Sequence, residues 1–86
     1  MALVLLPSSL RALFPGAPRK VTLEATTVGD LIDRLDERWP GMRDRVSDAG
    51  EIRQFVHVYV NGERATLATP IQEPATVHVI PAMAGG

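Results

Sequence analysis

Hydrophobic residues recur along the chain at two spacings, every second residue in some segments and every three or four residues in another. The longer spacing predicts one helix. Apolar residues recur every three or four positions up to Trp39, which places them on a single helical face. Thr27 is a suitable N-cap, with Asp30 three residues later as a weaker form of the capping box. Pro40 disfavours helical geometry at the residue before it, so the helix is expected from about Val28 to Arg38.

Shorter segments with period-2 alternation or compact apolar runs predict β-strands. The predicted strands are Ala2–Leu6, Arg19–Glu24, Phe55–Val60, a short one at Arg64–Leu67, and Thr76–Ile80. The Asn61-Gly62 pair is a hairpin-turn signal after the third of them. The order β-β-α-β-β-β favours an α+β fold, in which one main helix covers one face of a mixed sheet. The first strand should lie centrally beside the last, in parallel.

The segments between these elements give weaker signals. Residues 10–14 are expected to form a short helical turn or a wide loop, and residues 42–46 a further helical turn. Residues 47–51 are expected to form a loop, because Ser, Asp and Gly are concentrated there. No internal repeat is found, so one domain over residues 1–80 followed by a tail at 81–86 is the expected organisation.

Alternation also assigns side chains to the two faces of the predicted sheet. One face carries valines only: Val56, Val58, Val60, Val77 and Val79. The opposite face carries Phe55, His57, Tyr59, His78 and Ile80. The valines should meet the helix, which leaves aromatic and aliphatic side chains on the outer face as a surface for a partner protein. The alternative is that a covering loop buries some of them.

Composition excludes several classes of function. The net charge of −1, from nine basic and ten acidic residues, gives no reason to expect nucleic acid or an anionic membrane as a partner. The chain has no cysteine, so it has no disulfide, thiolate metal site or cysteine nucleophile. Two histidines without a Cys or carboxylate motif fall short of a metal site's usual ligand count. No apolar run is long enough for a membrane helix, and the expected location is the cytoplasm.

The tail that follows the last strand holds the candidate reactive group. Gly85 and Gly86 lack Cβ atoms, so they can pass through a channel too narrow for other residues. The terminal carboxylate of Gly86 is ionised at neutral pH. It can attack the α-phosphorus of ATP if a partner enzyme holds it in line near magnesium. Sulfide or a persulfide can then convert the acyl-adenylate to a thiocarboxylate. A frayed terminus is the plain structural alternative.

Three segments carry a resemblance to a known family. They are Val28–Ile32 at the start of the helix, Phe55–Gly62, and Val77–Gly86 with its terminal Ala84-Gly85-Gly86. Over essentially all 86 residues the chain resembles the MoaD/ThiS family of ubiquitin-like sulfur carriers. The resemblance implies a β-grasp fold with a flexible diglycine tail, adenylation by an E1-like enzyme that uses ATP, and a thiocarboxylate on Gly86. Such a carrier is a co-substrate, with no bound cofactor and no catalytic turnover of its own.

Within that family, the ending Ile80–Gly86 is most similar to the carrier of cysteine synthesis. That branch implies an O-phosphoserine-using synthase as sulfur acceptor and a metalloprotease that releases the product. Ala84 and Gly85 are expected to thread the partner's site. The expected partner-binding residues are Phe55, His57, Tyr59, His78, Ile80 and Met83. The alternatives are a molybdopterin synthase small subunit acting with its large subunit, a ubiquitin-like protein modifier, and a plain interaction domain.

Overall fold

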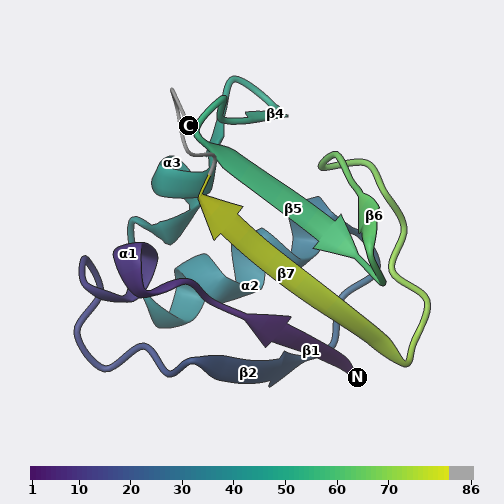
Figure 1. The fold of residues 1–86 in the computed structure, drawn as a ribbon, viewed down its shortest axis with the longest axis horizontal. Coiled ribbons are helices and arrows are strands. Elements are labelled where there is room, and N and C mark those ends of the chain that lie inside the picture. Colours follow the sequence, from purple (N-terminus) through teal and green to yellow (C-terminus); the bar gives the residue numbers. More distant parts are fainter. Residues whose placement is uncertain (82–86) are drawn as a thin grey trace.

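The structure is a computed structural model, and it describes residues 1–81. Within residues 1–81, three helices and seven strands follow one another, and Figure 1 shows their arrangement. In order they are β1 (Ala2–Leu5), α1 (Ser8–Arg11), β2 (Lys20–Leu23), α2 (Val28–Arg38), α3 (Met42–Val46), β3 (Ser47–Asp48), β4 (Glu51–Ile52), β5 (Val56–Val60), β6 (Glu63–Arg64) and β7 (Ala75–Pro81). Among residues 1–81 no helix is long and apolar enough to cross a membrane.

Five of the strands form one mixed sheet in the order β2-β1-β7-β5-β6. The central strand β7 and its neighbour β1 run parallel, and Val4 pairs with Val77. Their other neighbours, β2 and β5, are antiparallel to them, as Figure 1 shows by the direction of the arrows. The predicted parallel pairing of the first and last strands is therefore confirmed. A sheet of this order with one main helix across it is the β-grasp fold that the sequence predicts.

Helix α2 begins and ends where the sequence predicts. The Thr27 hydroxyl accepts a hydrogen bond of 3.1 Å from the Asp30 amide, which caps the first turn. The Asp30 carboxylate in turn accepts from the Thr26 amide at 3.0 Å, one residue before the position that a capping box would use. At the other end the helix stops at Arg38, before Trp39 and Pro40. The apolar stripe of α2 is buried, which fixes the side of the helix that faces the sheet.

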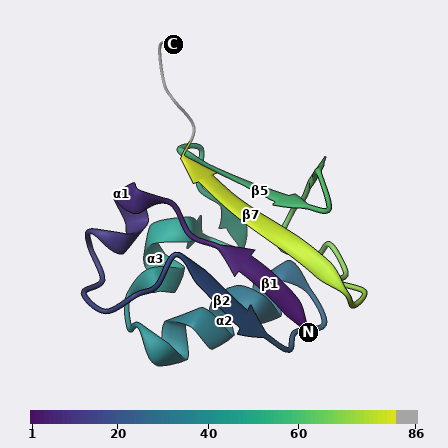
Figure 2. The ribbon, with the colours of Figure 1, turned by 60° about the horizontal axis from the view of Figure 1, so that its bottom comes forward.

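The core lies between α2 and the inner face of the sheet (Figure 2). Its fully buried side chains come from both layers: Val4, Val28, Leu31, Ile32, Leu35, Met42, Val46, Val58 and Val77. Val79 is also buried, whereas Val56 and Val60 at the ends of β5 are half-buried. The predicted valine face therefore does meet the helix. Burying these aliphatic side chains is the main source of stability in a domain of this size.

Two short segments differ from what the sequence predicts. Residues 47–51 were expected to form a loop, but β3 and β4 make a small hairpin that pairs Ser47 with Ile52. Ala49 and Gly50 both have positive φ values, 51° and 78°, which is typical of a two-residue hairpin turn. Alanine rarely takes this conformation, so Ala49-Gly50 does not resemble the Asn-Gly or Asp-Gly pairs that mark a two-residue hairpin turn.

The strand predicted at Arg64–Leu67 is shorter and starts one residue earlier, as β6 at Glu63–Arg64. The Asn61-Gly62 turn brings Glu63 directly opposite Val60, so pairing begins at once. After Ala65 the chain leaves the sheet edge and runs to the start of α2. There the Leu67 carbonyl accepts from the Gly29 amide at 2.9 Å, and a Cβ on Gly29 would lie 3.2 Å from that oxygen. Contact with the helix therefore ends the strand.

Candidate functional site

Four of the predicted partner-binding side chains lie together on the outer face of the sheet. The register of β5 and β7 places His57 opposite Ile80 and Tyr59 opposite His78. The His57 and Tyr59 rings meet edge to face, with their centroids 6.3 Å apart. Ile80 is 42% exposed and His78 is also exposed, while His57 and Tyr59 are half-buried. These four residues, hereafter the outer patch, form a connected aromatic and aliphatic surface. The covering loop considered above would have buried them, and they remain accessible.

Phe55 does not belong to the outer patch. It lies in the turn before β5 and is 64% exposed. Its ring lines a hollow of about 230 Å³ together with Leu13, Val46 and Val79, which are on the helix side of the sheet. The alternation rule placed it on the outer face because the strand was expected to begin one residue too early. Phe55 therefore offers an apolar contact at the edge of the domain, next to Pro81, which also lines this hollow.

The structure adds residues to the outer face that the sequence analysis did not assign. Leu5 of β1 lies beside His78, and Leu3 lies beside Thr76, so both leucines continue the apolar surface across β1. Arg64 of β6 is opposite Tyr59 at one edge, and Lys20 of β2 is opposite Leu5 at the other. The same alternation, applied to the first strand, would have found the two leucines. The flanking cations depend on strand order and could not be found that way.

The predicted reactive tail begins at the end of the central strand β7. Pro81, its last residue, pairs with Val56, so the strand runs one residue beyond the predicted Ile80. The residues on which the tail prediction rests, Met83 and Ala84-Gly85-Gly86, lie outside the described part of the chain. Five residues after Pro81 can span at most about 17 Å when fully extended. Gly86 can therefore lie well beyond the body of the domain while the outer patch remains in contact with a partner.

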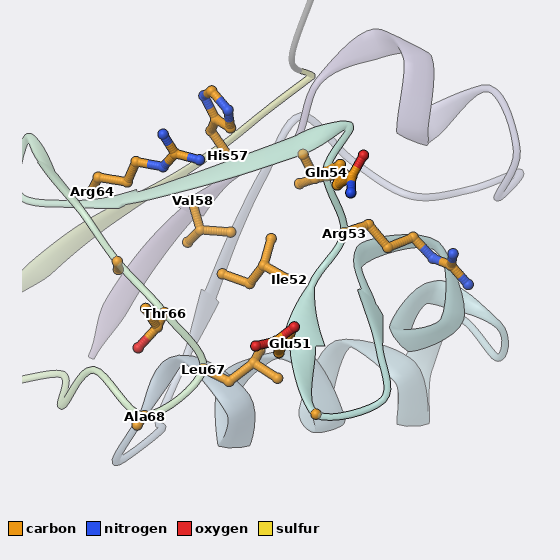
Figure 3. A pocket seen from close by; sticks show the side chains of 13 residues that line it. Glu51, Ile52, Arg53, Gln54, His57, Val58, Arg64, Thr66, Leu67 and Ala68 are labelled. Carbon is orange, nitrogen blue, oxygen red and sulfur yellow. The ribbon is translucent and has the colours of Figure 1, made fainter.

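A hollow of about 640 Å³ lies at the β6 edge of the sheet, between the β4–β5 connection and the segment after β6. Figure 3 shows Ile52, Val58 and Leu67 pointing into it, whereas His57 and Arg64 stand on the opposite side of β5 and β6. Aliphatic side chains from the margin of the core thus form its inner wall, and polar residues such as Glu51 and Gln54 also line it. Among residues 1–81 no group of three or more His, Cys, Asp or Glu side chains could hold a metal ion. His57 and His78 are not directly opposite each other, because His57 pairs with Ile80 and His78 pairs with Tyr59.

Comparison with known proteins identifies the family. The ThiS family model matches residues 4–86. The sulfur carrier protein CysO of Mycobacterium tuberculosis is 33% identical over 90 residues, which cover 96% of each chain. The Small archaeal modifier protein 3 of Haloferax volcanii is 33% identical over 64 residues, or 70% of each chain.

A solved structure extends the likeness to the whole fold. A chain in the crystal structure of the Amycolatopsis orientalis BexX/CysO complex matches with a TM-score of 0.90 and 29% identity, and the match covers 100% of both chains. The relatives are thus small ubiquitin-like proteins, named either as sulfur carriers or as protein modifiers. From the matched residues, the sheet order and these relatives, we conclude that the chain belongs to the ThiS family.

Proposed function

We propose that this chain is a sulfur carrier whose reactive group is the terminal carboxylate of Gly86. The carboxylate oxygen attacks the α-phosphorus of ATP in the site of an E1-like adenylyltransferase, and pyrophosphate leaves. Sulfide then attacks the carbonyl carbon of the acyl-adenylate, and AMP leaves with the bonding electron pair. The product is a thiocarboxylate on Gly86. ATP is used by the partner enzyme, and the chain itself is a co-substrate that binds no cofactor.

The observation that carries this proposal is a family match that extends through Gly86. The match includes the whole of Ala84-Gly85-Gly86. Curated relatives that align with nearly the full chain are named as sulfur carriers. The placement of β7 supports it, because the last described residue, Pro81, is at the end of a central strand next to the outer patch. A partner that holds this face would lie within reach of the five residues that follow. Gly85 and Ala84 are small enough to enter a narrow channel in that partner.

The outer patch is proposed to dock the activating enzyme and, afterwards, the enzyme that accepts the sulfur. An exposed cluster of aromatic and aliphatic side chains on a monomeric domain is typical of a protein interface. Met83 is proposed to contact the same partners from the tail, and Phe55 from the edge of the domain. The chemistry therefore takes place in the partner's site, and the domain supplies recognition and delivery.

The first test is the intact mass of the protein after incubation with ATP, magnesium, sulfide and its E1-like enzyme. We expect a gain equal to the replacement of one oxygen by sulfur. A control without ATP should remain unmodified. An unchanged mass with an enzyme that forms a stable complex with the chain would refute the proposal.

The proposed sulfur acceptor is a cysteine synthase-like enzyme that uses O-phosphoserine, with a metalloprotease releasing the new cysteine from the tail. The likeness to the CysO carriers supports this assignment. It can be tested with thiocarboxylated protein, which is mixed separately with such a synthase and with a molybdopterin synthase large subunit. Consumption of the thiocarboxylate in the synthase mixture alone is expected. Consumption only with the molybdopterin synthase subunit would show that the carrier serves that pathway instead.

A protein modifier is the second candidate, and the archaeal relative named as a modifier favours it. In that case the activated Gly86 carbonyl would form an isopeptide bond with a lysine of another protein. Immunoblots of cell extracts for this chain separate the two functions. High-mass species that resist boiling in detergent and thiol would indicate conjugation, while a single band at the carrier's own mass is expected of a dedicated sulfur donor.

A further inference from the structure

A cationic hollow of about 570 Å³ lies beside the outer patch, at the end of the sheet towards which β1 and β7 run. Three segments supply its polar side chains: α1, the start of β2 and β7. These side chains are Ser8, Arg11, Arg19, Lys20 and His78. Strand pairing joins the hollow to the outer face, since Leu5 lies between Lys20 on one side and His78 on the other.

The charge of this hollow is not balanced within the described part of the chain. Three cations line it, and no Asp or Glu among residues 1–81 does so. The ion pairs found in these residues involve Arg34, Arg43 and the amino group of Met1, so none includes Arg11, Arg19 or Lys20. Like charges held close together repel one another, and an incoming anion relieves that repulsion. The hollow is therefore complementary to negative charge.

Arg11 provides a second, independent indication. Its Nε atom is buried, and no acceptor among residues 1–81 forms a hydrogen bond with it. Buried N–H groups in folded proteins nearly always have a hydrogen-bond partner. The guanidinium group presents its donors in a planar fork that matches a carboxylate. Arg11 as a whole is half-buried and lines the hollow, so its guanidinium group can also donate to a carboxylate that enters the hollow.

We propose that the cationic hollow receives an acidic segment of the enzyme that activates Gly86, with two or more carboxylates meeting Arg11, Arg19 and Lys20. A protein segment fits better than a single phosphate, because the cations come from separate elements and the hollow adjoins the outer patch, which the same partner can cover. The hollow lies beside the outer patch, and His78, which lines it, is three residues before Pro81. One partner surface can therefore cover both the hollow and the outer patch. The opposite layer, by contrast, carries four acidic residues along α2, which would repel the same segment. This inference rests on the proposed function.

The test compares binding of the activating enzyme at low and high salt, with matched changes of charge. Arg19→Gln with Lys20→Gln removes two exposed cations from the hollow, and Arg34→Gln with Arg38→Gln removes two from α2. At low salt we expect the first variant to bind about tenfold more weakly, mainly through a slower association rate. The control should bind nearly as well as the unaltered chain, because its changed residues lie away from the hollow. Near 1 M salt, where the screening length is about 3 Å, the three proteins should converge.

Arg11→Gln is measured separately, with its circular dichroism spectrum as a check of folding. A folded Arg11→Gln protein should also bind more weakly at low salt. Equal affinity and equal salt dependence for the hollow variants and the α2 control would overturn the inference. Amide shifts at Ser8, Arg11 and Lys20 on titration with inorganic phosphate alone would also overturn it, in favour of a phosphate site.

These outcomes are distinct from failure of the proposed function. If the unaltered chain gains sulfur but the hollow variants bind normally, only the inference about the hollow fails. If the unaltered chain binds its enzyme and never gains sulfur, the proposed function fails, whatever the hollow variants do.

Discussion

The two faces of the same sheet differ in what their side chains do. On the inner face Val4, Val58 and Val77 are at most 1% exposed and pack under α2, whereas Ile80 on the outer face is 42% exposed. Both sets come from the same strands, separated only by the alternation of successive residues. Aliphatic residues on the inner face stabilise the fold. Apolar residues on the outer face contribute less to folding and remain available for binding.

This division explains how so small a domain can stay folded and still expose aromatic and aliphatic side chains on its outer face, the surface proposed for binding. A five-stranded sheet with helices on both faces would have no apolar surface left for a partner. Here one layer of helix suffices for the core, and the outer face continues to the point where the chain proceeds to Gly86. Substitutions that change one face and leave the other intact test whether the inner face determines stability and the outer face determines binding.

The largest effect on stability is expected from the inner layer. Leu31 of α2 is fully buried, so Leu31→Ala should lower the free energy of unfolding by about 2–5 kcal/mol. Urea denaturation followed by circular dichroism measures this loss. Glu37→Ala, on the exposed side of the same helix, is the matched control and should change stability by less than about 0.5 kcal/mol. A Leu31→Ala protein as stable as the control would mean that this side of α2 does not form the core.

On the outer face, Ile80→Ser should affect binding rather than folding. We expect the affinity for the activating enzyme to fall about tenfold, which corresponds to about 1.4 kcal/mol, because an apolar anchor of the interface is lost. The free energy of unfolding should change by less than about 0.5 kcal/mol. Isothermal titration calorimetry and urea denaturation of the same sample check both parts. Glu37→Ala serves again as the control and should bind normally. An Ile80→Ser protein that loses stability but keeps its affinity would contradict the account.

A smaller effect is expected at the N-cap of α2. Thr27→Ala removes the hydroxyl that accepts from the Asp30 amide, and should cost about 1 kcal/mol of stability. In a domain of this size that lowers the midpoint of thermal unfolding by about 4–8 °C. Thr27→Ser keeps the hydroxyl and should unfold close to the unaltered protein. Both variants should bind partners normally once folded, because Thr27 is remote from the outer face; impaired binding by Thr27→Ala at a temperature where it is folded would argue against that separation.

Much of this fold could be predicted because its main signals are local. The bounds of α2 and α3 and the parallel pairing of the first and last strands are all as the sequence predicts. Helix α2 has a cap, an uninterrupted apolar stripe and a proline stop, and these do not depend on the rest of the chain. The parallel placement of the first strand beside the last followed from connectivity, since a crossover that contains a helix separates them.

The errors occur where distant residues decide the outcome. Strand β6 ends early because its continuation contacts the start of α2, some 40 residues before it in the chain. Phe55 lies just outside β5, so a one-residue error in the strand's start put its ring on the wrong face. The cationic hollow joins Arg11 to Lys20 and His78 through sheet order, which no local pattern reveals.

The central claim is that sulfur is carried on Gly86 itself. The most direct measurement is tandem mass spectrometry of the C-terminal peptide after incubation with the E1-like enzyme, ATP and sulfide. For the unaltered chain, the account predicts that the replacement of oxygen by sulfur maps to the Gly86 carboxyl group. A chain that lacks Gly86 should keep its fold, and its mass should not change on the same incubation. Sulfur found on any other residue, or gained equally by the shortened chain, would contradict the claim.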